Sequence, residues 1–125
     1  MMVAPLVLIL AAPGASPTPA DPPLACHAKA LDRAGRERQQ ALLALVRSSV
    51  KETLELPDGF ALRLPADARL FRDIAEWVTL ERKCCGFVDY AIEWKRDDSV
   101  WVKLTGAPGT KEALAAEMGL EAIRR

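Results

Sequence analysis

Residues 50–64 read VKETLELPDGFALRL, which is two short stretches of alternating character on either side of a turn. In the second stretch the large apolar residues occupy alternate positions, at Phe60, Leu62 and Leu64. This period of two is typical of a strand with one buried face. Residues 57–59, Pro-Asp-Gly, favour a tight turn because proline presets φ and glycine tolerates a positive φ. The stretch therefore predicts a β-hairpin.

The hairpin is one half of a weak internal repeat. The segment DGFALRL at residues 58–64 aligns with DSVWVKL at residues 98–104, and a strand of alternating residues is predicted over 88–94. Helical spacing of apolar residues predicts helices over 28–46, 68–84 and 110–118. The order is a helix followed by two ββα units. Two short hairpins bury their apolar faces best in one sheet, so we expect an α+β fold with a four-stranded, mainly antiparallel sheet and helices packed on it.

Several details of this fold are left open or depend on single residues. The helix at 68–84 is long enough to connect parallel strands, so the strand order stays open. Its apolar stripe is expected to face the sheet, with the charged Glu81 as the exception. Gly86 fits a left-handed helix end, and Thr110 fits a helix cap. Trp94 is expected in the core, together with Trp77.

Composition limits the class of protein. The chain has 125 residues, of which half are hydrophobic and 27% are charged, so it can bury a core and form a single domain. Its 17 basic and 17 acidic residues give a net charge of zero. A chain without excess positive charge lacks the long-range attraction that nucleic-acid binders use, and we expect no nucleic-acid partner.

The first 20 residues resemble a secretory signal peptide, because a short apolar run at 6–10 is followed by small residues and prolines. The run is shorter than the roughly 20 residues that cross a bilayer, so the processed protein is not expected to be an integral membrane protein. We assign residues 1–20 to the signal peptide, 21–27 to a linker, 28–119 to the domain and 120–125 to a tail. This predicts a periplasmic or extracellular protein, or a cytoplasmic one if translation starts further downstream.

The only concentrated chemistry is the segment ERKCCGF at residues 81–87, together with Cys26 and His27. Three thiols and one imidazole complete a tetrahedral ligand set for zinc, and the thiols also suit a soft ion such as Cu(I). The leading hypothesis is therefore a metal site made by Cys26, Cys84 and Cys85, with His27 as fourth ligand. Adjacent helical residues diverge by about 100°, so this site requires the helix to unwind at Gly86.

Two other hypotheses use the same cysteines. The first is an exported structural or interaction domain that binds no metal, in which Cys26 forms a disulfide; the sequence allows the pairs Cys26–Cys84, Cys26–Cys85 and Cys84–Cys85. The other is a thiol redox protein. A cysteine at a helix C-terminus is not activated as a nucleophile, and no Ser-His-acid, phosphate-loop or paired-carboxylate motif is evident. The sequence thus favours a protein without enzymatic activity, and it does not identify a protein partner.

Four segments together resemble a family of small bacterial proteins with a Glu-Arg-x-Cys-Cys-Pro-Phe motif, which is linked to heavy-metal contexts. They are ELPDGF at 55–60, AEW at 75–77, ERKCCGF at 81–87 and LTGAPGTKE at 104–112. By this resemblance Cys26 matches an early cysteine, and Cys84 and Cys85 match the central pair. The chain departs from the motif at Gly86, where the family has proline, and an export segment is not associated with the family. The resemblance carries no enzymatic activity over to this chain.

Overall fold

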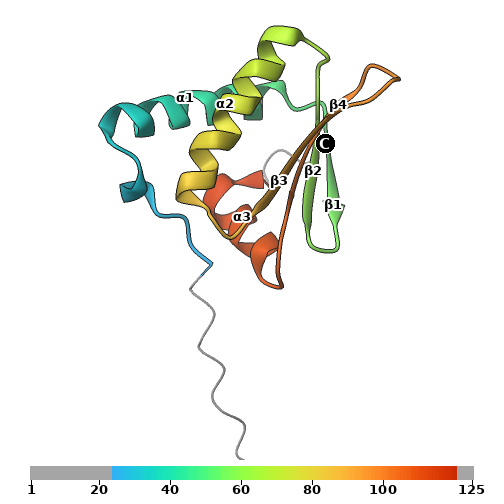
Figure 1. The fold of residues 1–125 in the computed structure, drawn as a ribbon. Helices are drawn as coiled ribbons and strands as arrows, with labels where there is room; N and C mark the ends of the chain where they lie inside the picture. Colours follow the sequence, from blue (N-terminus) through green and yellow to red (C-terminus); the bar gives the residue numbers. More distant parts are fainter. Residues whose placement is uncertain (1–23, 121–125) are drawn as a thin grey trace, which may run out of the picture.

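The helices of the chain gather on one side of a four-stranded sheet, as Figure 1 shows for a computed structural model that describes residues 24–120. The predicted signal peptide and residues 121–125 of the predicted tail lie outside the described residues. The elements in chain order are a 3-10 helix η1 (Ala28–Ala30), α1 (Arg33–Ser49), β1 (Glu52–Leu56), β2 (Gly59–Leu64), α2 (Ala68–Cys84), β3 (Asp89–Trp94), β4 (Val100–Thr105) and α3 (Thr110–Met118). This is the α+β fold that the sequence predicts.

The sheet has the strand order β1-β2-β4-β3, and every neighbouring pair is antiparallel. The two repeats meet at its centre. Leu62 pairs with Val102, and these two residues are equivalent in the sequence repeat. The ββα units are therefore related by a local two-fold axis between β2 and β4, which settles the strand order that the sequence leaves open.

The core lies between the sheet and the helices. Trp77 and Ile74 of α2 are fully buried against the inner face of the central strands, where Phe60, Leu62 and Val102 are at most 1% exposed. Burial of one such side chain stabilises the fold by about 1.5–3 kcal/mol. The predicted core position of Trp77 is confirmed.

The predicted helix over residues 28–46 is wrong in its first part. The chain forms the 3-10 turn of η1, extends at Asp32 and only then begins α1, which continues to Ser49. The Asp32 carboxylate accepts a hydrogen bond of 2.7 Å from the Gly35 N–H. Aspartate favours this capping position over a helix interior because its side chain satisfies a free N–H of the first turn.

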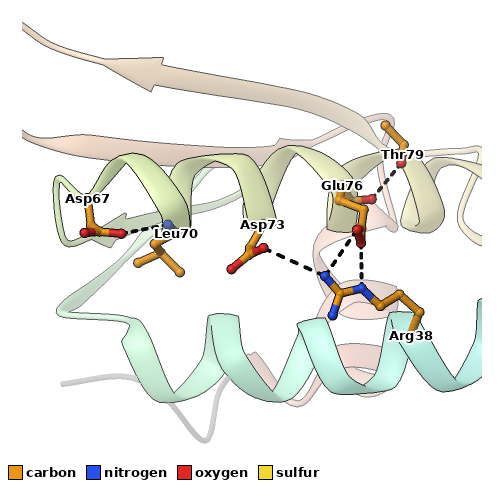
Figure 2. A network of polar contacts seen from close by, with 6 residues as sticks. All are labelled: Arg38, Asp67, Leu70, Asp73, Glu76 and Thr79. Carbon is orange, nitrogen blue, oxygen red and sulfur yellow. Dashed lines mark hydrogen bonds and ion pairs between the residues drawn. The ribbon is translucent and has the colours of Figure 1, made fainter.

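The predicted bounds of α2 are confirmed, whereas the predicted roles of Gly86 and Thr110 at helix ends are wrong. α2 spans the predicted residues, and the Asp67 carboxylate caps it by accepting a 2.8 Å hydrogen bond from the Leu70 N–H (Figure 2). Gly86 does not adopt a left-handed conformation, and the Val88 N–H after it donates a hydrogen bond to the Cys85 carbonyl. Thr110 is not a cap either: it is the first residue of α3, after Gly109 at φ 97°.

Trp94 is exposed and not part of the core as expected. It is the last residue of the edge strand β3, and 43% of it is exposed. Its ring packs on Phe71 with centroids 5.4 Å apart, while its indole N–H donates to Asp98 at 2.7 Å. The end of an edge strand allows an indole to bury one side of its ring and keep its polar edge in water.

An ion pair joins the two long helices. Arg38 of α1 donates from Nε to the Glu76 carboxylate of α2 at 2.7 Å and lies 3.8 Å from Asp73 (Figure 2).

No helix within residues 24–120 is long and apolar enough to cross a membrane.

Candidate thiol site at the end of α2

A disulfide bond joins Cys26 to Cys85, two residues that are 59 positions apart in the sequence. The pairing is one of the three that the sequence allows. Cys84, the last residue of α2, keeps a free thiol that is 3% exposed. The structure thus assigns different roles to the two adjacent cysteines.

The backbone explains how Cys26 reaches the helix end. The last four carbonyl groups of a helix have no partner within the helix. The carbonyl of Cys84 is one of them, and it accepts a 2.8 Å hydrogen bond from the His27 N–H. The segment before η1 therefore crosses the end of α2 in a position that brings the Cys26 sulfur to Cys85.

A buried carboxyl group lies beside the disulfide. Glu81 is one helical turn before Cys85 and only 1% exposed. Its Oε1 accepts hydrogen bonds from Gln39 Nε2 at 2.6 Å and from Trp77 Nε1 at 2.8 Å. Its Oε2 lies 3.5 Å from the Cys85 sulfur. A disulfide sulfur carries no hydrogen, so in the oxidised protein this contact involves no S–H donor.

Burial raises the pKa of the Glu81 carboxyl, and the hydrogen bonds from Gln39 and Trp77 oppose this shift. The sequence predicts that Glu81 does not face the sheet with the apolar stripe; its side chain is nevertheless buried, with hydrogen bonds from Gln39 of α1 and Trp77 of α2. The sequence does hold an indication of this arrangement. Trp77, Glu81 and Cys85 follow one another at intervals of four residues, which places them along one side of the helix.

The neighbouring polar groups titrate outside their ordinary ranges. Burial, and secondarily the charge of Glu81, raises the pKa of the Cys84 thiol. Tyr90, which donates to the Cys85 carbonyl at 3.4 Å, has its phenol pKa raised mainly by burial. Since the thiolate is the reactive form of cysteine, the raised pKa of Cys84 disfavours its reactive form.

All three cysteines line one cavity of about 280 Å³. Its wall also includes Gln39, Glu81 and Met118, which come from α1, α2 and α3. The folding of the chain thus gathers the three cysteines in one place. His27 is exposed and does not line the described part of this cavity, although its N–H anchors the segment.

Of the four residues predicted as metal ligands, the three cysteines lie close together, but two of them are bonded to each other. Cys26 and Cys85 are bonded to each other, and metals bind the thiolate form of cysteine. Within residues 24–120, no group of three or more His, Cys, Asp or Glu side chains is arranged to hold a metal ion. A site made by Cys26, Cys84, Cys85 and His27 stays a prediction that would require the disulfide to be reduced.

Comparison with known proteins yields no relative: no family model, no curated protein and no solved structure matches the chain. The resemblance to the Glu-Arg-x-Cys-Cys-Pro-Phe family stays a prediction.

Proposed function

We propose that this chain is an exported structural or interaction domain without metal, in which the Cys26–Cys85 disulfide fastens the leading segment across the end of α2. The observation that carries this proposal is the disulfide itself. Disulfides form and persist in oxidising compartments such as the periplasm and the extracellular space. The apolar run near the start of the chain supports the same location.

The energetic effect of such a bond is large for a domain of this size. Linking residues 59 positions apart stabilises the folded chain by about 4 kcal/mol in the chain-entropy treatment. The whole stability of a small domain is about 5–15 kcal/mol. Among the residues of this segment whose burial is described, Leu31 is the one buried in the core. The disulfide attaches this segment to α2 together with the hydrogen bond from the His27 N–H to the Cys84 carbonyl.

Thiol counting on protein secreted into the periplasm of a bacterial host, and purified without reductant, tests the proposal. Titration with Ellman's reagent in denaturant is expected to find one free thiol per chain, that of Cys84, and three after reduction. Peptide mapping should link Cys26 to Cys85, and elemental analysis should find no stoichiometric metal. A Cys84→Ala variant is the matched control, with no free thiol before reduction.

The same measurements test the metal hypothesis. A protein with three free thiols and one equivalent of zinc or a softer ion would overturn the proposal and favour the metal site. Three free thiols without metal would also overturn it, because the disulfide would then be absent from the exported protein.

A further inference from the structure

The two sulfur atoms of the disulfide lie in different surroundings. Cys26 is partly exposed, whereas Cys85 is 1% exposed and has Glu81 Oε2 at 3.5 Å. Both residues line the cavity, and Cys26 is the more exposed of the two, so we expect a thiol from solvent to attack the Cys26 sulfur. Thiol–disulfide exchange depends on which sulfur is accessible and on how well the other sulfur is stabilised as it leaves. Here the Cys26 sulfur is the accessible one, and the Cys85 sulfur is the one that leaves.

We propose that the Cys26–Cys85 disulfide is a thiol–disulfide exchange site, which takes a small amine-bearing thiol on the Cys26 sulfur and releases Cys85 as a thiol facing Glu81. This inference rests on the disulfide of the proposed function and goes beyond it, since a fastening bond does not have to exchange.

The exchange balances without any further reactant. The thiolate of the small molecule attacks the Cys26 sulfur, a new sulfur–sulfur bond forms there, and the Cys26–Cys85 bond breaks. The electron pair of the broken bond passes to the Cys85 sulfur, which takes up from solvent the proton that the small thiol has lost. A second molecule of the same thiol can then displace Cys26. The protein disulfide is reduced by two electrons, and the two small thiols are oxidised to their disulfide.

Glu81 distinguishes the reduced from the oxidised site. Its Oε1 already accepts hydrogen bonds from Gln39 and Trp77. Its Oε2 is the oxygen that faces the Cys85 sulfur, and it can accept a hydrogen bond from Cys85 only when Cys85 becomes a thiol. Because a buried acceptor without a donor is unfavourable, this contact stabilises the reduced state relative to the disulfide.

The charge of the cavity selects the class of thiol. Among its described lining residues, Glu81 and Glu117 are acidic, and the side chains of Gln39 and Gln40 are polar and neutral. No lysine or arginine belongs to this described lining. A thiol with a positive ammonium group is therefore favoured over one with a negative group.

The first experiment locates the attacked sulfur in the unaltered protein. Oxidised protein is treated briefly with cysteamine, quenched with N-ethylmaleimide and mapped by mass spectrometry. We expect cysteamine on Cys26 and maleimide on both Cys84 and Cys85, and in a Cys84→Ala variant cysteamine on Cys26 and maleimide on Cys85 alone. Cysteamine on Cys85, or no adduct at concentrations that reduce an exposed disulfide, would overturn the inference. Mapping of the untreated protein shows separately whether the disulfide exists, on which the proposed function depends.

The second experiment measures the redox equilibrium of a Glu81→Gln variant. Gln39 and Trp77 both donate to Oε1, so the amide oxygen of the variant has to take that place and its NH₂ group faces sulfur. This group cannot accept the S–H of Cys85. The equilibrium constant for reduction should fall about tenfold, which is about 30 mV toward more negative potentials. An unchanged constant in a variant with a native circular dichroism spectrum contradicts the role of Glu81.

The third experiment tests the preference for a charged thiol. Cysteamine and 2-mercaptoethanesulfonate are similar in size and opposite in charge, and their rates are compared per concentration of thiolate at low salt. Cysteamine should react at least several-fold faster, and Glu117→Gln should reduce this ratio without changing the redox equilibrium. Equal rates in the native protein would overturn the assignment to amine-bearing thiols.

Discussion

Glu81 is a charged residue in a position that ordinarily holds an apolar one. Transfer of a carboxyl group into the interior is unfavourable unless hydrogen bonds replace those to water. Two helices provide these bonds, since Gln39 belongs to α1 and Trp77 to α2. The buried carboxyl thus links the packing of α1 and α2 to the chemistry of Cys85. A change at Gln39 is expected to affect both.

We predict that Gln39→Leu destabilises the protein by about 1–3 kcal/mol, because it leaves a buried oxygen with one donor fewer. The loss of this hydrogen bond also raises the pKa of Glu81 further. Urea denaturation at neutral pH measures the free energy of unfolding. Gln40→Leu, at the exposed neighbouring position, is the control and should change stability by much less. Equal effects of the two substitutions would contradict a specific role of Gln39.

Strand β2 depends on a close approach between backbones at its first residue. Gly59 pairs with Thr105 of β4, and a Cβ atom at this position would lie only 1.8 Å from the Leu104 carbonyl oxygen. Such an overlap cannot be relieved by a side-chain rotation because the obstacle is backbone. The glycine of the Pro-Asp-Gly turn is therefore required for the pairing of the two central strands, and not for a positive φ, which it does not adopt.

Gly59→Ala should accordingly destabilise the protein by more than the roughly 1 kcal/mol of an average substitution. The matched control is Gly86→Ala. There a Cβ atom would meet nothing closer than 3.4 Å, and the nearest atom is the mobile end of the Arg82 side chain. Thermal unfolding followed by circular dichroism compares the two variants. A similar melting temperature for both would show that the β2–β4 contact adjusts more easily than expected.

The contact between α1 and α2 includes the exposed Arg38–Glu76 pair (Figure 2). The hydrogen bond from Arg38 lowers the pKa of Glu76 below its ordinary value. A carboxyl with a lowered pKa in the folded state stabilises that state above its unfolded pKa, and the effect disappears as the pH falls through the folded pKa. The pair is open to solvent, so its contribution is small and weakened by salt.

Glu76→Gln should therefore lower the melting temperature slightly at neutral pH and low salt. The difference from the unaltered protein should vanish in acid, below the lowered pKa of Glu76, and shrink at high salt. Glu37→Gln is the control, because the Arg33–Glu37 pair lies within α1 and is more exposed. A difference that persists unchanged in acid would assign the effect to packing and not to the ion pair.

The Cys26–Cys85 bond links the start of the described chain to the residue that follows α2. The two ββα units are already joined through β2 and β4, and the segment before α1 lies outside this symmetric arrangement. The disulfide and the backbone hydrogen bond from His27 to Cys84 connect it to α2. Removal of the bond should weaken the fold without changing the sheet.

Cys26→Ser is predicted to lower the free energy of unfolding by about 4 kcal/mol in the absence of reductant. In the presence of dithiothreitol the unaltered protein should lose the same amount, so that the two become equal. Cys84→Ser serves as the control and should keep the dependence on reductant. If Cys26→Ser and the unaltered protein unfold alike without reductant, the bond does not stabilise the domain.

Local patterns in the chain were sufficient for the hairpins, for α2 and for α3, because alternation and helical spacing depend on residues a few positions apart. The Pro-Asp-Gly turn and the Asp67 cap are local in the same sense. The three cysteines could also be recognised as one site from their residue type. These features together predicted the α+β class correctly.

The strand order, the choice of Cys85 over Cys84, the burial of Glu81 and the exposure of Trp94 depend on contacts between distant segments. Cys84 and Cys85 are adjacent in the chain, and only the path of residues 24–32 across the end of α2 brings Cys26 to one of them. Glu81 is buried because Gln39 of another helix reaches it, and Trp94 is exposed because its strand is at the sheet edge. Contacts of this kind form between segments that are far apart in the chain. They leave no periodic pattern in the sequence from which they could be predicted.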